Sequence, residues 1–220
     1  MVFYGAPGTG KTTVARLIGQ IYRSLGVLPK GHCIETDRAG LVAGYVGQTA
    51  IKTTEVLNKA LGGVLFIDEA YPLTPKGDRE DPFGQEAVDT LLKFMEDHRK
   101  ELVVIVAGYT EEMNRFITSN PGLQSRFPNY LFFDDYTPAQ LTHIFRTLCE
   151  DSDYSLGPEA EQKLMAVFAD AYAHRDHTFS NARFVRNLFE KSLSNQASRL
   201  VTVAAPNRET LLEISALDIP

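Results

Sequence analysis

The fold of this chain is decided near its start, by the stretch Val2-Phe3-Tyr4-Gly5-Ala6-Pro7-Gly8-Thr9-Gly10-Lys11-Thr12-Thr13. Its first three residues have the apolar and aromatic character of a buried strand, and Gly5 ends that strand. From Gly5 to Thr12 the sequence matches the pattern G-x-x-x-x-G-K-[ST] in full. Apolar residues at helical spacing follow from Lys11 to Leu25. This pattern between a strand and a helix predicts a phosphate-binding loop.

The residue types of the loop suit a nucleotide. Glycines let backbone N–H groups close around phosphate oxygens, and the N-terminus of the following helix adds a favourable dipole. We expect Lys11 to reach the β- and γ-phosphates of ATP, Thr12 to hold Mg²⁺, and the whole stretch from Gly5 to Thr13 to contact the nucleotide. The alternative is a glycine-rich turn that binds nothing, and the flanking strand and helix argue against it.

Two carboxylates follow a second buried strand. Residues 64–67 form a continuous apolar run, and Asp68 and Glu69 come directly after it. Asp68 is expected to orient Mg²⁺, and Glu69 to polarise the water that attacks the γ-phosphate. Taken alone, the pair would be read as a solvated acidic turn. Beside a complete phosphate loop, it favours ATP hydrolysis over passive nucleotide sensing.

The rest of the chain divides into two parts. Strands are expected over 33–36, 64–67, 102–107 and 130–133, helices over 50–61 and 85–99, and a loop over 72–82. This alternation predicts an α/β P-loop NTPase with a parallel five-stranded sheet flanked by helices. From Thr137-Pro138 onward only helices are expected, over 138–150, 158–173 and 182–199. We therefore expect an α/β nucleotide-binding core over residues 1–135, with an upstream segment missing, and a small all-helical lid over 136–220.

Composition narrows the function classes. The chain has 220 residues, of which 44% are hydrophobic and 23% charged, as in an ordinary globular protein. Its formal net charge of −6 argues against a nucleic-acid partner. Cys33 and Cys149 fit no metal-ligand spacing and are expected to be reduced thiols of a cytoplasmic protein. No apolar run approaches the ~20 residues that span a bilayer.

Beyond these motifs, several segments resemble an AAA+ ATPase, most closely the CbbX/CfxQ–SpoVK group, which includes red-type rubisco activases and a type VII secretion ATPase. The segments are Gly40–Lys52, Gly62–Tyr71, Phe83–Glu96, Leu102–Gly108, Ser119–Phe127 and Asn181–Phe189. The resemblance covers nearly the whole chain but does not separate the clients of this group. It implies a homo-oligomeric ring, a hexamer, that hydrolyses Mg-ATP and engages a client polypeptide at its central pore.

The resemblance also implies roles for individual residues. Arg126 looks like an arginine finger that reaches the γ-phosphate held by a neighbouring subunit, although on its own it would be an ordinary surface arginine. Arg183 looks like a lid residue that contacts the nucleotide of its own subunit, with Arg186 as a second candidate. Tyr45-Val46-Gly47 resembles a pore loop that grips the client. The alternative for Tyr45 is a ring folded back onto the core.

One departure from the family pattern leaves a rival function open. Where AAA+ proteins often carry a polar sensor, commonly asparagine, this chain has Val106-Ala107-Gly108-Tyr109-Thr110. The hydroxyl of Tyr109 or Thr110 could substitute for it. The rival is a nucleotide-gated oligomeric scaffold with little turnover, and Glu69 and Arg126 argue against it. Steady-state phosphate release distinguishes the two functions.

Overall fold

A computed structural model describes residues 1–45, 47–75 and 81–220 of the chain. The chain divides into two compact units. The first unit contains Met1–Gly5 and Gly10–Phe133, and the second contains Ala6–Thr9 and Asp134–Pro220. The tip of the phosphate loop therefore belongs to the second unit, although the strand before it and the helix after it belong to the first unit.

The first unit is built on a parallel five-stranded sheet. Its strands are β1 (Val2–Gly5), β2 (Cys33–Thr36), β3 (Val64–Ile67), β4 (Val103–Gly108) and β5 (Tyr130–Phe133). Their spatial order is β2-β3-β4-β1-β5, and all four neighbouring pairs are parallel. Every residue of β3 is buried, as its unbroken apolar sequence predicts. The expected α/β architecture is confirmed.

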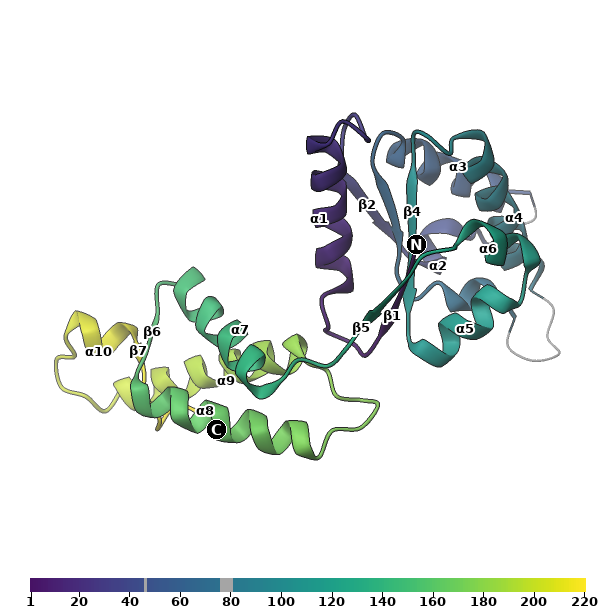
Figure 1. Ribbon diagram of the computed structural model, residues 1–220. Coiled ribbons are helices and arrows are strands. Elements are labelled where there is room, and N and C mark those ends of the chain that lie inside the picture. The colour runs from purple at the N-terminus through teal and green to yellow at the C-terminus, as the bar shows by residue number, and fades with distance from the viewer. Residues whose placement is uncertain (46, 76–80) are drawn as a thin grey trace. The chain divides into compact units, whose positions relative to one another are not determined.

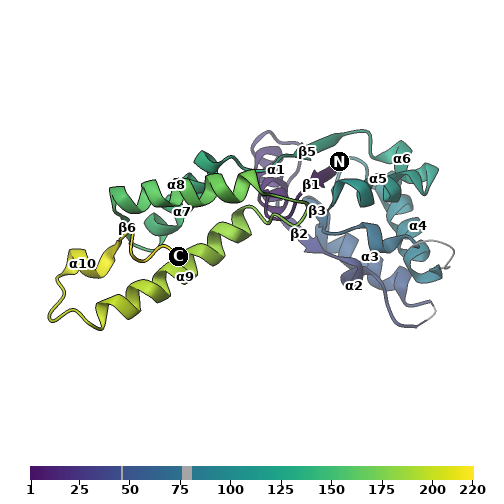
Figure 2. The ribbon, with the colours of Figure 1, turned by 90° about the horizontal axis from the view of Figure 1, so that it is seen from below.

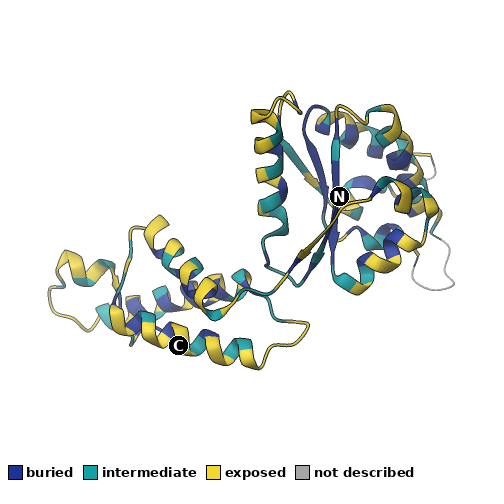
Figure 3. Ribbon diagram, in the orientation of Figure 1, coloured by how far each residue is buried: buried dark blue, intermediate teal, exposed yellow. Residues whose placement is uncertain are grey.

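Helices cover both faces of this sheet (Figure 1). On one face lies α1 (Lys11–Ser24), whose Ala15 packs in a buried cluster with Phe3 and Phe66. On the other face, Leu57 and Leu91 join a larger buried cluster with Leu65. The helices of that face are α3 (Thr49–Ala60), α4 (Pro82–Asp97), α5 (Thr110–Thr118) and α6 (Pro121–Arg126). Figure 3 shows the middle of the sheet as the buried centre of the unit, whereas most of the edge strand β5 is exposed.

Several short elements of the first unit were not expected from the sequence. They are α2 (Arg38–Leu41), α5, α6 and the 3₁₀ turn η1 (Tyr71–Leu73). Each is too short for apolar periodicity to stand out, and side-chain caps start two of them. Asp37 accepts a hydrogen bond from the N–H of Gly40 at the start of α2, and Asn120 accepts one from Gly122 at the start of α6. Asp81 likewise caps α4, which begins at Pro82 rather than at the expected Gln85.

The second unit is a helical lid, as expected. Its long helices are α7 (Pro138–Asp151), α8 (Pro158–Ala173) and α9 (Ala182–Leu200), and Figures 1 and 2 show them packed together. Thr137 and Gln140 form a reciprocal capping box at the start of α7. The lid also contains α10 (Arg208–Leu212) and a small parallel pair that was not expected, β6 (Ser155–Leu156) with β7 (Glu213–Ile214). None of the helices in the described part of the chain combines the length and apolar character needed to cross a bilayer.

An ion pair fastens the C-terminal tail to the lid. The carboxylate of Asp218 is 1% exposed and lies 2.7 Å from Nε of Arg199 on α9. It also accepts hydrogen bonds from the backbone N–H and the hydroxyl of Ser215, both at 2.8 Å. Burial alone would raise the pKa of Asp218, but the hydrogen bonds from Arg199 and Ser215 outweigh it, so the pKa lies below its usual value.

We predict that Asp218→Asn destabilises the lid by about 2–3 kcal/mol, because it leaves Arg199 without its charged partner. The contribution is present above the unfolded pKa of about 4 and is lost as the pH falls through the lowered folded pKa. Urea unfolding at pH 7 and at lower pH measures both effects. The control is Glu161→Gln, which breaks the more exposed pair with Arg146 and should cost at most about 1 kcal/mol. Equal losses in the two variants would contradict a special role for Asp218.

Candidate functional site

The order of the strands explains why distant segments of the first unit meet at one edge. The carboxyl ends of parallel strands share an edge, and β4 pairs with both β1 and β3. Residue Val106 of β4 is in register with Val2 on one side and Ile67 on the other. Three segments therefore leave the sheet side by side: the start of the phosphate loop after β1, the residues after Gly108 at the end of β4, and the acidic pair after β3. The segment after β4 lies between the other two.

The predicted phosphate-binding residues Lys11, Thr12 and Thr13 form the first turn of α1. Gly10 precedes them with φ 91°, a left-handed conformation, and no side chain of the described residues caps the helix. No acidic residue occupies the first turn, so the positive end of the helix dipole is not neutralised there. The ammonium of Lys11 donates a hydrogen bond to the carbonyl of Gly5 at 3.0 Å. This bond folds the lysine back over its own loop.

Gly5 shows why the first position of the motif is glycine. Its φ is 145°, and a Cβ atom added there would lie 2.1 Å from the carbonyl oxygen of Phe133 on β5. No side chain fits between the two strands at this point. The turn out of β1 therefore depends on a residue without a Cβ.

The acidic pair has an unusual backbone. Asp68 is half-buried and Glu69 is exposed at the end of β3. Glu69 has φ 44°, a left-handed conformation that costs a non-glycine residue free energy. Its N–H donates to the Asp68 carboxylate at 3.0 Å, and the next N–H, of Ala70, donates to Ala107 on β4 at 3.0 Å. These bonds turn the chain sharply directly after β3.

Two tyrosines lie close together after β3 and β4, and no sequence pattern pointed to one of them. The ring centroids of Tyr71 and Tyr109 are 6.1 Å apart. Burial, the charge of Glu69 and a hydrogen bond to its carboxylate raise the pKa of the Tyr71 hydroxyl well above its usual value. Tyr109, the candidate sensor residue, precedes α5 and Thr110 begins it. The sequence indicated no role for Tyr71, although the charge of Glu69 acts on its hydroxyl.

Arg126 is the last residue of α6. Its guanidinium lies 3.5 Å from the carboxylate of Glu96 on α4, a weak contact between two partly exposed side chains. The Nε atom of Arg126 is buried and has no hydrogen-bond partner in the described part of the chain. The head group is thus supported by α4 without being held in a strong ion pair.

The candidate pore loop has an exposed tip on a fixed base. The side chain of Tyr45 is 79% exposed, which excludes the alternative of a ring folded onto the core. Gly47 is also exposed, and Val46 lies outside the described residues. The base of the loop is held from α3. The Lys52 ammonium donates to the carbonyls of residues 39 and 42, and the buried hydroxyls of Thr49 and Thr53 bond to the backbone of residues 43 and 41.

The remaining predicted residues belong to the second unit. Ala6, Pro7, Gly8 and Thr9 lie against the start of α9, where the N–H of Ala182 donates to the carbonyl of Gly8 at 3.1 Å. Arg183 is an exposed residue of the first turn of α9, and Arg186 is exposed one turn later. Arg183 therefore follows directly the residue that contacts the phosphate loop.

The residues present fit Mg-ATP. A glycine-rich turn leads into a helix N-terminus that no described side chain caps, as an anionic phosphate requires. The Thr12 hydroxyl and the Asp68 carboxylate are oxygen ligands of the kind that Mg²⁺ prefers, and in such sites Mg²⁺ is bound by one or two protein oxygens together with phosphates and water.

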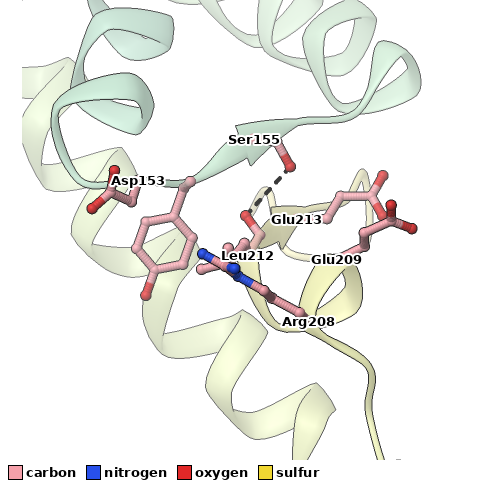
Figure 4. A pocket seen from close by; sticks show the side chains of 7 residues that line it. Asp153, Ser155, Arg208, Glu209, Leu212 and Glu213 are labelled. Carbon is pink, nitrogen blue, oxygen red and sulfur yellow. Dashed lines mark hydrogen bonds between the residues drawn. The ribbon is translucent and has the colours of Figure 1, made fainter.

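A separate hollow in the lid contains none of the predicted site residues (Figure 4). It lies where β6 meets β7 and α10, and the Ser155 hydroxyl donates to the carbonyl of Leu212 at 3.5 Å across it. Its wall is mostly charged and is formed by Asp153, Tyr154, Ser155, Arg208, Glu209, Leu212 and Glu213.

Comparison with known proteins agrees with this geometry. Residues 1–135 match the ATPase family associated with various cellular activities (AAA), and residues 137–220 match the AAA lid domain. The chain belongs to the AAA family of ATPases. It is therefore a nucleotide-binding enzyme that hydrolyses ATP, and AAA ATPases typically assemble into rings.

Within the AAA family, the chain is similar to the predicted group. Stage V sporulation protein K of Bacillus subtilis is 48% identical over 220 residues, which are 100% of this chain and 68% of that protein. The chloroplastic ribulose bisphosphate carboxylase/oxygenase activase of Cyanidioschyzon merolae is 46% identical, over 100% of this chain and 74% of the relative. Protein CfxQ of Xanthobacter flavus is 44% identical, over 100% and 68%. The crystal structure of the FIGL-1 AAA domain shares the fold, with a TM-score of 0.64, 16% identity, and coverage of 99% of this chain and 67% of that one.

Proposed function

We propose that this AAA ATPase uses ATP hydrolysis to remodel a client protein, acting as a hexameric ring that engages the client at its central pore. The observation that carries the proposal is the loop around Tyr45. An aromatic side chain that is 79% exposed stands on a base held by four hydrogen bonds from α3. Such a tip offers a large apolar contact at little cost in side-chain entropy, which suits gripping many different peptide segments.

The hydrolytic step is assigned to the residues that the sequence motifs and the resemblance single out. Lys11 and the backbone of residues 5–13 bind the phosphates, and Thr12 and Asp68 hold Mg²⁺, which neutralises phosphate charge when bound. Glu69 accepts a proton from the attacking water. The water oxygen bonds to the γ-phosphorus, and the bond from that phosphorus to the β–γ bridging oxygen breaks, giving ADP and inorganic phosphate. Arg183 contacts the nucleotide of its own subunit.

Arg126 is proposed to act across the subunit interface. Arg126 lies at the end of α6, its contact with Glu96 is weak, and its Nε has no hydrogen-bond partner among the described residues. The guanidinium is therefore able to take a stronger partner. An anionic γ-phosphate in a neighbouring subunit is such a partner, because a guanidinium bonds to phosphate through several N–H groups at once.

A scaffold with little turnover stays the second candidate, because Val106-Ala107-Gly108-Tyr109-Thr110 stands where AAA+ proteins often carry a polar sensor. The hydroxyl of Tyr109 or Thr110 would have to take the place of that sensor. Steady-state phosphate release distinguishes the two candidates. If neither ring assembly nor addition of a client increases the rate of ATP hydrolysis, the scaffold is favoured.

We predict that Glu69→Gln keeps ATP binding and slows hydrolysis by about 10²-fold or more, the scale of losing a positioned general base. The amide keeps the shape of the side chain and removes its basicity. Phosphate release and nucleotide titration measure the two properties separately. Turnover near the wild-type rate would show that another group activates the water.

We predict that Arg126→Ala binds ATP but hydrolyses it about 10³-fold more slowly or worse, the scale of an arginine finger. Mixing this variant with Lys11→Ala tests the action across subunits. Some sites of a mixed ring then combine an intact phosphate loop with an intact Arg126 from the neighbour, so activity should partly return. Absence of recovery in rings shown to be mixed counts against a role in trans.

We predict that Tyr45→Ala leaves ATP binding, assembly and basal hydrolysis within about twofold while client remodelling falls about tenfold or more, since the side chain is exposed and its base is held independently. Tyr45→Phe is the matched control and should remodel normally. Ribulose bisphosphate carboxylase/oxygenase, named in the activase relative, is a suitable first client. Remodelling that survives in Tyr45→Ala would exclude gripping by this loop.

A further inference from the structure

The tip of the phosphate loop is held by the lid through its carbonyl oxygens. Within the second unit, the carbonyl of Pro7 accepts from the side-chain amide of Asn181 at 3.3 Å. The carbonyl of Gly8 accepts from the N–H of Ala182 at 3.1 Å, and that of Thr9 from the Tyr136 hydroxyl at 3.1 Å. Three consecutive carbonyls of the loop thus have donors from the lid.

The orientation of these carbonyls decides the orientation of the amides that a phosphate would contact. In a planar trans peptide, the N–H of one residue points opposite to the C=O of the residue before it. Donors that hold the carbonyls of residues 7, 8 and 9 on the lid side therefore turn the N–H groups of Gly8, Thr9 and Gly10 the other way. Successive N–H groups turned to one side form an anion-binding concavity.

Asn181 is the centre of this arrangement. It is fully buried at the start of α9 and has φ 50° and ψ −120°, a strained backbone for asparagine. Its side chain does not cap α9, although asparagine often does so. Instead, its carbonyl oxygen accepts from the N–H of Tyr136 at 2.9 Å, and its NH₂ donates to the Asp135 carboxylate at 2.8 Å as well as to Pro7. One side chain links the first residues of the lid to the loop.

The backbone of the phosphate loop approaches the backbone at the start of α9 closely, which supports the same interpretation. Gly8 has φ 72°, and a Cβ atom there would lie 2.1 Å from the carbonyl oxygen of Ser180 and 3.1 Å from the N of Arg183. The loop therefore packs directly on the start of α9. The N–H of Ala182, which has no acceptor within its own helix, is satisfied by the loop.

We propose that Asn181 and Tyr136 are positioning residues that pre-orient the phosphate-binding amides of the loop from the lid side. They act on the phosphates through the peptide groups of residues 7–10 and do not touch the nucleotide. The inference rests on the phosphate-loop role proposed above.

The test compares ADP and ATP binding by calorimetry in the full chain. Tyr136→Phe removes one hydrogen bond and keeps the ring, so the Kd of both nucleotides should rise about 2- to 10-fold with little change in thermal midpoint. Asn181→Ala removes the central link and should raise Kd about tenfold or more. In both variants KM for ATP rises with Kd while kcat stays within about twofold, because the lost interaction serves substrate and transition state alike.

The matched control is Gln196→Ala. Gln196 is also a buried amide of α9, and it donates to the carbonyls of Leu211 and Glu213 without touching the loop. The Gln196→Ala substitution should lower the thermal midpoint and leave the Kd of both nucleotides within about twofold of the wild-type value. If Asn181→Ala and Tyr136→Phe also leave Kd within twofold while Lys11→Ala abolishes binding, this inference alone is overturned. If Lys11→Ala binds as wild type, the phosphate-loop role fails and the inference with it.

Discussion

A peptide group that offers its N–H to a phosphate must turn its carbonyl oxygen the opposite way, and that oxygen needs a donor of its own. Much of this structure follows from this constraint. The loop after β1 has no helical ladder or sheet neighbour to supply such donors at its tip. They come from the lid, through Asn181, Ala182 and Tyr136. This is why four residues near the start of the chain are grouped with its C-terminal part.

The sheet solves a second problem, which is to bring the chemical groups to one edge. Parallel pairing of β1, β4 and β3 places the helix N-terminus with Lys11 and the acidic pair after Ile67 on either side of β4. Glu69, the second of the two adjacent carboxylates, then lies at a sharp turn with a left-handed backbone. Strain at this position is consistent with a site in which orientation matters more than local stability.

The parts of this structure that local patterns encode could be predicted from the sequence. The five strands, the phosphate loop and the three long lid helices are set by apolar runs, glycines and caps over short windows, and they lie where expected. The resemblance to AAA+ proteins added Arg126, Arg183 and Tyr45. The links from Tyr136 to Thr9 and from Asn181 to Pro7 could not be predicted, because they join residues 127 and 174 positions apart and follow no periodicity. Tyr71 was missed because no sequence pattern indicates that a tyrosine after an acidic pair lies close to the carboxylate.

Gly8 occupies a position that the motif leaves open to any amino acid, since G-x-x-x-x-G-K-[ST] fixes only Gly5, Gly10, Lys11 and Thr12. Here the backbone of Ser180 closes that position to every side chain. The lid therefore restricts which residue can stand inside the phosphate loop. The sequence that the loop can have depends on the backbone of the lid segment that packs against it. A loop transplanted from an NTPase with no such lid could satisfy the motif completely and still clash with Ser180.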